Sequence, residues 1–296
     1  MATSYKPALL KALVRLVRRG IGPNIPLQTI GHEFVTMYWT QTVVFRLRQE
    51  FTLSKESEVV HSIREAAEIA GVRDLSKLSS GVRTRLDRKM AQILPINVLD
   101  LFHKSKPASM GELYHWDRGE DAVRLTIAGQ HFIGENAAAL ESIANVWWAR
   151  FLERRNGLAP LVIEKVERDG VRRERLTAYV RILQRLDGNR CFYCERDLAT
   201  NSATHVDHVI PWSFLLSNPS WDLVLACGAC NLAKSDHLPT ESFIQKLAVT
   251  NATRRQAELP RAFASALLLN DDEIDRYYAA AISVEWPAGW SPSTSQ

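Results

Sequence analysis

Four cysteines are the residues whose type and spacing most directly suggest chemistry. They form two Cys-x-x-Cys pairs, Cys191 with Cys194 and Cys227 with Cys230, and the sequence has no other cysteine. Four thiolates arranged in two such pairs can converge on a tetrahedral zinc ion, and a closed site of this kind stabilises a fold without catalysing a reaction. Disulfides are the alternative, but thiols stay reduced in a cytoplasmic protein. We therefore expect a structural zinc site.

The segment that joins the two pairs predicts two strands, and a helix follows it. The β-branched residues Val206, Val209 and Ile210 favour a strand, which Pro211 should end because proline has no N–H to donate. After a loop, the apolar run Trp221-Asp222-Leu223-Val224-Leu225 predicts a second extended segment. The second cysteine pair then turns the chain into a short helix. The expected order is strand, strand, helix.

This module resembles the HNH endonucleases, also called ββα-metal or His-Me finger nucleases, in the subgroup with a four-cysteine zinc site. The resemblance rests on the Asp207-His208 pair between the cysteines and on Asn231 and Lys234 just after the last cysteine. The same strand and helix are similar to the HNH domain of RNA-guided CRISPR nucleases, which lack the cysteine pairs. The resemblance covers residues 191–239 only.

The resemblance implies a metal-dependent endonuclease that hydrolyses the phosphodiester bonds of DNA. His208 would be the general base, since an ordinary histidine pKa of about 6.5 suits proton transfer near neutral pH. Asp207 and Asn231 would hold a divalent ion, Mg²⁺ or Mn²⁺, which prefers oxygen ligands and stabilises charge on the phosphate and the leaving oxygen. Because Asp207 and His208 are adjacent, a regular strand directs them to opposite sides. Both can reach one phosphate only if the strand end twists or bulges.

Two more residues belong to the predicted catalytic site. Asp222 stands at the middle position of the HNH triplet, where the family usually has an asparagine that pins a loop by hydrogen bonds to its backbone. Aspartate can accept such bonds but cannot donate them, and it could instead orient His208 through a ring N–H. Lys234 lies three residues after Asn231 on the same helix face, where it could meet a phosphate. The alternative for Lys234 is an ordinary solvated lysine.

Upstream of the module, the spacing of apolar residues predicts mainly helices. Residues 56–70 and 136–155 show helical periodicity. Gly71 is expected to end the first of these helices, and Asn136 is expected to be the N-cap of the second. Residues 123–133 and 161–166 are expected to supply short strands. Residues 172–187 predict a helix with an arginine-rich face, which could follow a phosphate backbone.

The predicted fold class is therefore α+β and mostly α. We expect a large helical region at residues 1–186, a small zinc-stabilised ββα-metal (HNH) domain at residues 187–240, and a helical tail at residues 241–296. Within the tail, Asn270 with Glu273 three residues later predicts the start of a helix. The helical region is too large for a linker. Its expected roles are positioning of the substrate, formation of a homodimer, or docking of a regulatory protein partner.

Composition limits the class of protein further. The chain of 296 residues is 46% hydrophobic and 24% charged, values typical of globular proteins. No run of about 18 apolar residues occurs, so we expect no membrane-spanning helix. The basic residues 1–20 are interpreted as the first helix of a cytoplasmic protein rather than as a transit peptide. Lys and Arg exceed Asp and Glu in the first hundred residues and are outnumbered in the last hundred, so a bound polyanion would meet the front and middle of the chain.

Three functions are compatible with these residues. The leading one is a DNA endonuclease, which analogy with other HNH proteins places in restriction or anti-phage defence. A zinc-stabilised module that binds nucleic acid or protein without cutting is the second, and an RNA-directed nuclease is the third.

Overall fold

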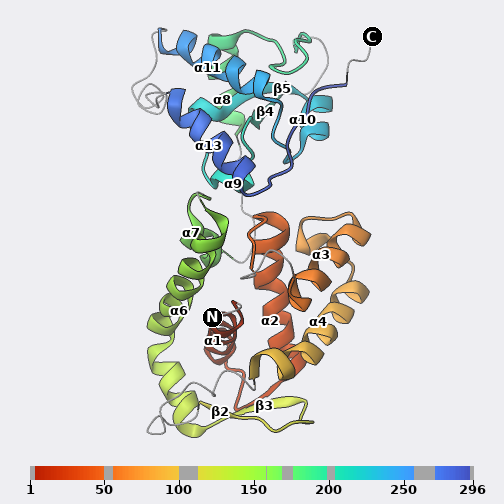
Figure 1. Ribbon diagram of the computed structural model, residues 1–296, viewed down its shortest axis with the longest axis vertical. Coiled ribbons are helices and arrows are strands. Elements are labelled where there is room, and N and C mark those ends of the chain that lie inside the picture. Colours follow the sequence, from red (N-terminus) through yellow and green to blue (C-terminus); the bar gives the residue numbers. More distant parts are fainter. Residues whose placement is uncertain are drawn as a thin grey trace. The chain divides into compact units, whose positions relative to one another are not determined.

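The computed structural model describes residues 4–49, 56–99, 113–157, 159–168, 176–198, 204–256 and 271–293. The chain divides into two compact units (Figure 1). The first comprises Met1–Asn156 and Val162–Val171, and the second comprises Gly157–Leu161 and Arg172–Gln296. Each unit is described by itself.

The first unit is mainly helical. Helix α1 packs along α6, and α2 packs along α4. The rings of Tyr38 and Trp148, from α2 and α6, contact each other in the core with centroids 5.2 Å apart. The helices are α1 (Tyr5–Arg18), α2 (Leu27–Trp39), α3 (Glu58–Ala70), α4 (Ser80–Leu94), α6 (Ile127–Asn156) and α7 (Val162–Glu167), with the shorter turns η1 (Thr40–Val44), η2 (Leu75–Lys77) and η3 (Pro95–Leu99).

Local signals explain where α3 begins and ends. The Ser57 hydroxyl accepts a hydrogen bond from the amide of Val60, as expected of an N-cap residue. Gly71 ends the helix in the left-handed region, at φ 61°, where glycine pays no steric penalty. The helix predicted at residues 56–70 is therefore confirmed.

Two strands predicted in the first unit are corrected by the structure. The strand expected at residues 123–133 ends at Leu125, because the Thr126 hydroxyl accepts the amide hydrogen of Gly129 and starts α6. The strand expected at residues 161–166 was wrong, since these residues lead into and form α7. The actual sheet is small and antiparallel in the order β1-β3-β2, made of β1 (Asn24–Pro26), β2 (Tyr114–His115) and β3 (Ala122–Leu125).

Helix α6 is longer than its predicted portion, residues 136–155. Asn136 was expected to cap the N-terminus, but it lies within the helix and kinks it, with φ −110° and ψ 16°. Its side-chain amide donates to the carbonyl of Phe132, one turn back. The side chain therefore bonds to the preceding helical turn instead of starting a new helix.

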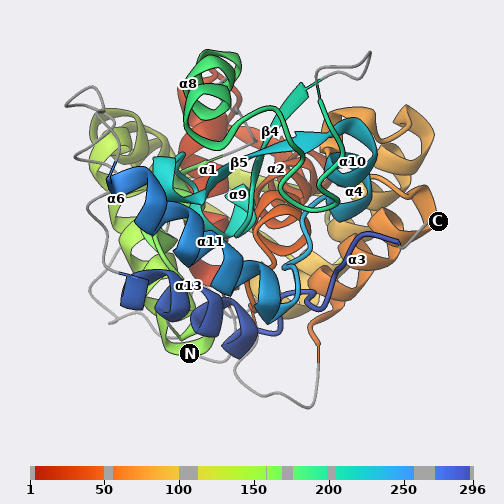
Figure 2. The same cartoon turned by 90° about the horizontal axis from the view of Figure 1, so that it is seen from above.

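The second unit contains the strand–strand–helix order that the sequence predicts. Strands β4 (Thr204–His208) and β5 (Leu223–Cys227) pair antiparallel, and α10 (Gly228–Lys234) packs beside them (Figure 2). Between the strands the chain forms a short helix, in the segment where the sequence predicted a loop, and then a 3-10 turn directly before β5. The remaining elements are α8 (Thr177–Asp187), α9 (Trp212–Leu215), η4 (Ser220–Asp222), α11 (Glu241–Arg255) and α13 (Asp271–Ser283).

Helix α8 belongs to this second unit, although the sequence placed it before the predicted boundary at residue 187. It packs on both strands of the sheet and buries Leu183 in the core. Arg181 and Arg185 on its outer face are exposed. Three other arginines of the predicted basic helix, at positions 172, 173 and 175, lie outside the described residues, as does the helix start expected at Asn270.

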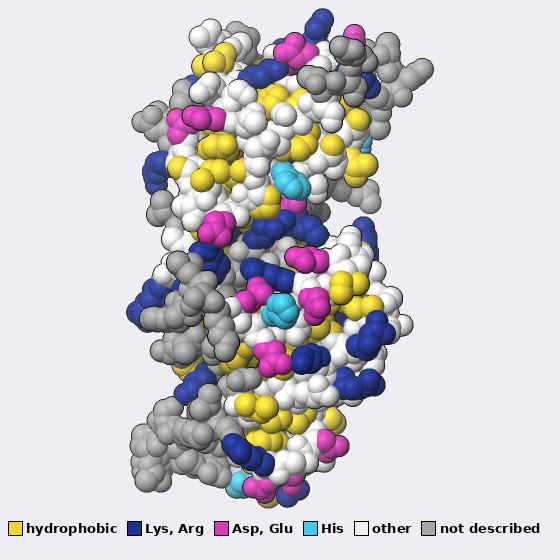
Figure 3. Space-filling view, turned by 45° about the vertical axis from the view of Figure 1, so that its right-hand side comes forward, with side chains coloured by type: hydrophobic (Ala, Val, Ile, Leu, Met, Phe, Trp, Pro, Cys, Tyr) yellow, Lys and Arg dark blue, Asp and Glu magenta, His cyan; other side chains and the backbone are white. Residues whose placement is uncertain are grey.

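The predicted fold class, α+β and mostly α, is confirmed. Within the part of the chain that the structure describes, no helix is both long and apolar enough to cross a membrane. The face of the first unit drawn in the lower part of Figure 3 mixes Lys and Arg with Asp and Glu side chains. That face is therefore not a uniformly basic surface.

Candidate functional site: the ββα module

The four cysteine side chains meet in one cluster. Their sulfur atoms all lie within 4.8 Å of one another, and none is in a disulfide bond. The Cys194 and Cys227 sulfurs are 3.8 Å apart. A tetrahedral zinc ion with Zn–S bonds of about 2.3 Å would separate its sulfurs by about 3.8 Å. The cluster therefore has the donor set and the spacing that a four-cysteine metal site requires.

Local structure sets different proton affinities within the cluster. Burial raises the pKa of the Cys191 thiol and that of the Cys230 thiol. Burial also acts to raise the pKa of Cys227, but hydrogen bonds from the Cys230 amide and from neighbouring thiols outweigh it and lower the pKa. Cys227 is the N-cap residue of α10, so its sulfur accepts a backbone N–H as a thiolate would. The cluster is thus predisposed to carry negative charge at Cys227.

Asp207 lies near the end of β4 and is held by two side chains. Its Oδ2 accepts a hydrogen bond of 2.7 Å from the hydroxyl of Tyr193 and lies 3.1 Å from the Nζ of Lys234. The residue is 8% exposed. Burial and the negative charge of Asp207 raise the pKa of Tyr193 well above its usual value, so Tyr193 stays a donor at physiological pH. One oxygen of the carboxylate is therefore fixed by protein groups.

His208, the last residue of β4, points to a different partner. Its Nε2 lies 3.0 Å from the Oδ1 of Asn218, in the loop after α9. With an amide oxygen as its partner, Nε2 carries the proton, and the basic lone pair is then on Nδ1. The strand pairing is regular as far as His208, which faces Leu223. The bulge considered from the sequence is therefore absent from the described pairing, and the strand simply ends here.

Asp222 pins the chain that leaves β4. Its Oδ1 accepts the amide hydrogen of Ile210 at 2.7 Å, and its own carbonyl accepts that of Val209 at 3.0 Å. The residue is completely buried, and Oδ2 has no hydrogen-bond partner among the described residues. Burial raises the pKa of its carboxyl well above the usual value. Of the two roles considered from the sequence, Asp222 takes the loop-pinning one, and Asn218 takes the contact with the His208 ring.

Lys234 of α10 reaches the end of strand β4. Lys234 is fully buried, and its Nζ donates to the carbonyl of His208 at 2.6 Å in addition to its ion pair with Asp207. The sequence allowed either a phosphate contact or a solvated lysine; the structure instead gives Lys234 buried protein partners. Asn231 is half-buried and lies one helical turn before Lys234, on the same face of α10.

Two residues of this arrangement were not singled out from the sequence. Tyr193 lies inside the first Cys-x-x-Cys pair, so its position between two metal ligands was an available signal. Asn218 lies in a loop ten residues after His208, and no spacing rule connects the two. The sequence therefore predicted candidate catalytic groups but not the side chains that hold them.

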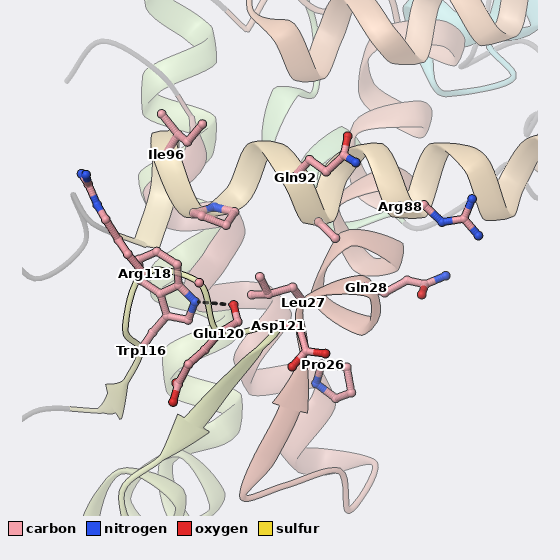
Figure 4. A pocket seen from close by; sticks show the side chains of 13 residues that line it. Pro26, Leu27, Gln28, Arg88, Gln92, Ile96, Trp116, Arg118, Glu120 and Asp121 are labelled. Atoms are coloured by element: carbon pink, nitrogen blue, oxygen red, sulfur yellow. Dashed lines mark hydrogen bonds between the residues drawn. The ribbon is translucent and has the colours of Figure 1, made fainter.

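A separate pocket of about 730 Å³ lies in the first unit (Figure 4). The start of α2, the end of α4 and the turn between β2 and β3 line it, and the indole N–H of Trp116 donates to the carbonyl of Glu120. Its charged lining residues are two arginines and two carboxylates: Arg88, Arg118, Glu120 and Asp121. These charges balance, so the pocket shows no preference for the sign of a ligand's charge.

The order of elements and the grouped residues of the second unit agree with one family of enzymes. A comparison with curated proteins found no match, and neither did a comparison with solved structures. The match to a protein family spans both cysteine pairs, both strands and α10. Residues 191–240 of this chain match the family model of the HNH endonucleases.

Proposed function

We propose that the second unit is a metal-dependent HNH endonuclease that hydrolyses phosphodiester bonds in DNA. His208 acts as the general base and takes a proton from the attacking water at its Nδ1. Asn218 supports this role, because it holds the imidazole by the opposite nitrogen. Asp207 and Asn231 are the ligands of the catalytic divalent ion.

The observation that carries this proposal is the contact of α10 with the end of β4. Asn231 is distant in sequence from Asp207 and His208, but Lys234, one turn later on the same helix, bonds to both of them. Because Asn231 lies one turn before Lys234 on the same face of α10, this contact supports the assignment of Asn231 as a second ligand beside Asp207. The proposal thus combines a carboxylate, an amide oxygen and an imidazole near the end of β4.

The residues fit a hard divalent ion such as Mg²⁺ or Mn²⁺. Asp207 and Asn231 offer oxygen donors, which these ions prefer. Only one oxygen of Asp207, Oδ2, is engaged by Tyr193 and Lys234. When bound, the ion would supply Lewis-acid stabilisation of the phosphate and of the leaving oxygen. Asp222 keeps the chain after His208 in place through the amides of Val209 and Ile210.

We also propose that the four-cysteine cluster holds a structural zinc ion. All four ligands are thiols, so a bound zinc ion would have no open position for a reaction. Residues 1–186 would position the substrate, join two copies of the chain, or hold a protein partner that controls cutting. Restriction or defence against phage is the setting that we favour by analogy with other HNH proteins.

The test is a plasmid-cutting assay on zinc-loaded protein with Mg²⁺ or Mn²⁺, comparing wild type with His208→Ala. Loss of a general base lowers the rate by about 10²-fold to 10⁴-fold. We expect nicked or linear plasmid with wild type and almost none with the variant. His131→Ala is the matched control, because His131 is exposed on α6 in the first unit, where it pairs with Glu135.

Equal cutting by wild type and His208→Ala, at equal zinc content, would contradict the assignment of the base. No cutting by folded wild type on any DNA, together with cutting of RNA under the same conditions, would change the substrate class. Tight DNA binding without cutting, unaffected by Asp207→Ala, would favour the binding-module alternative.

A further inference from the structure

Tyr193 connects the cysteine cluster to the metal-binding carboxylate. It is the third residue of the first Cys-x-x-Cys pair, between Cys191 and Cys194, and it is 4% exposed. Its hydroxyl reaches Oδ2 of Asp207 at 2.7 Å. Because Cys191 and Cys194 are both in the thiol cluster, a metal ion bound there fixes the backbone on each side of Tyr193. The position of the hydroxyl therefore depends on the closed cluster.

The ring of Tyr193 is enclosed by aromatic residues from the C-terminal part of the chain. Phe243 of α11 and Trp290 lie edge-on to it, with centroids 5.4 Å and 5.0 Å away. Trp290 is anchored by backbone hydrogen bonds with Leu238 and Thr240. These contacts restrict the ring to one orientation, in which its hydroxyl points at Asp207.

The cysteine pair is also tied to α11. The Nζ of Lys246 donates to the carbonyl of Phe192 at 2.7 Å and pairs with Glu195 at 3.0 Å. The Phe192 amide donates to the carbonyl of Leu225 in β5. The turn that carries Tyr193 is thus fixed to the sheet on one side and to α11 on the other.

We propose that Tyr193 is a positioning residue for the catalytic metal: its hydroxyl fixes the rotamer of Asp207 so that the other carboxylate oxygen, Oδ1, is presented to the divalent ion. The cysteine cluster, through Tyr193, then has a role in metal binding at the catalytic site as well as in folding. This inference rests on the proposed function, since it takes Asp207 as a ligand of the divalent ion. Groups that orient metal ligands commonly change metal affinity by about 10-fold to 100-fold when they are lost.

The experiment measures Mn²⁺ binding to the zinc-loaded full chain by electron paramagnetic resonance, independently of cutting. Binding that disappears in Asp207→Ala is assigned to the catalytic site. Tyr193→Phe removes the hydroxyl but keeps the ring and its aromatic contacts. We expect unchanged zinc content, Mn²⁺ affinity lower by about 10-fold or more, and recovery of most of the cutting rate at saturating Mn²⁺.

Tyr278→Phe is the matched control, because it removes a hydroxyl that donates to the Pro239 carbonyl in the same unit. It should leave Mn²⁺ affinity unchanged. Equal Mn²⁺ affinity in wild type and Tyr193→Phe, with normal cutting by wild type, would overturn this inference alone. Absence of Asp207-dependent Mn²⁺ binding in wild type would overturn both this inference and the proposed metal site.

Discussion

The two ends of the β4–β5 sheet are held by different kinds of interaction. At one end, Thr204 faces Cys227, and four thiols gather around a common centre. At the other end, His208 faces Leu223, and buried polar side chains bond to the backbone. A two-stranded sheet is marginally stable by itself, so both ends need support from outside the strands.

The polar end depends on residues that are distant in sequence. Arg254 of α11 is 1% exposed and donates to the carbonyl of Leu223 at 3.0 Å and to the carboxylate of Asp187 at 2.9 Å. Asn251, one turn earlier, donates to the carbonyl of Trp221 at 2.8 Å. A metal ion at the cysteine end would join four ligands, whereas hydrogen bonds and an ion pair of buried polar groups hold the other end. We therefore expect substitutions at the two ends to destabilise the module in different ways.

The largest effect is expected at the cysteine end. Cys230→Ser, or removal of zinc by a chelator, should unfold the ββα module, since structural zinc contributes on the order of 10 kcal/mol to small folds. The first unit has its own core and contains no cysteine, so its helices should remain. Circular dichroism should show a partial loss of helix, and amide exchange should report the loss within residues 191–240. Simultaneous loss of structure in both units would contradict this prediction.

A smaller effect is expected from Arg254→Ala at the other end. The change leaves the Leu223 carbonyl without its donor and the Asp187 carboxylate, whose side chain is 19% exposed, without its ion pair, at a cost of about 1–3 kcal/mol. The amides of Val209 and Ile210, which bond to Asp222, should exchange faster, while zinc content stays constant. Arg255→Ala is the control, since Arg255 is the exposed neighbour and surface substitutions change stability by about 0.5 kcal/mol or less. Equal effects of the two variants on exchange would argue against a separate polar end.

The smallest effect is expected from Asp222→Asn, and it should depend on pH. Burial raises the pKa of the Asp222 carboxyl in the folded protein above its value in the unfolded chain, about 3.9. Its contribution to stability is therefore complete below that value and is lost as the pH rises towards the folded pKa. Asparagine does not titrate and keeps an oxygen for the Ile210 amide. Relative to wild type, the variant should gain melting temperature between pH 4.5 and pH 8, and a pH-independent difference would refute the prediction.

Local sequence patterns predicted those helices whose ends are set by neighbouring residues. The α3 helix was predicted from the helical spacing of its apolar residues and from Gly71, which ends it. The strand predicted at residues 161–166 failed because a short apolar run is compatible with either helix or strand. Tertiary contacts decide between them, and here the buried Nζ of Lys11 donates to the Val166 carbonyl near the end of α7. Asn136 likewise does not begin a helix, because its side-chain amide bonds to the Phe132 carbonyl of the preceding helical turn.

The proposed chemistry of the module follows from the sequence itself. The two cysteine pairs, the adjacent Asp207 and His208, and Asn231 after the last cysteine predict the metal donors, the general base and the order of elements, and the structure has that order. These features are local, because ligand type and spacing along the chain are sufficient to express them. The family match to residues 191–240 agrees with this interpretation.

Only the tertiary structure decided how these groups are held. In the folded chain the hydroxyl of Tyr193 bonds to Asp207, and the amide oxygen of Asn218 bonds to His208. The buried amine of Lys234 bonds to the carbonyl of His208 and pairs with the carboxylate of Asp207. Such partners depend on which surfaces meet when the sheet, α10 and the C-terminal segment pack together. Hydrogen bonding and burial act through space, and so their partners are not specified by spacing along the chain.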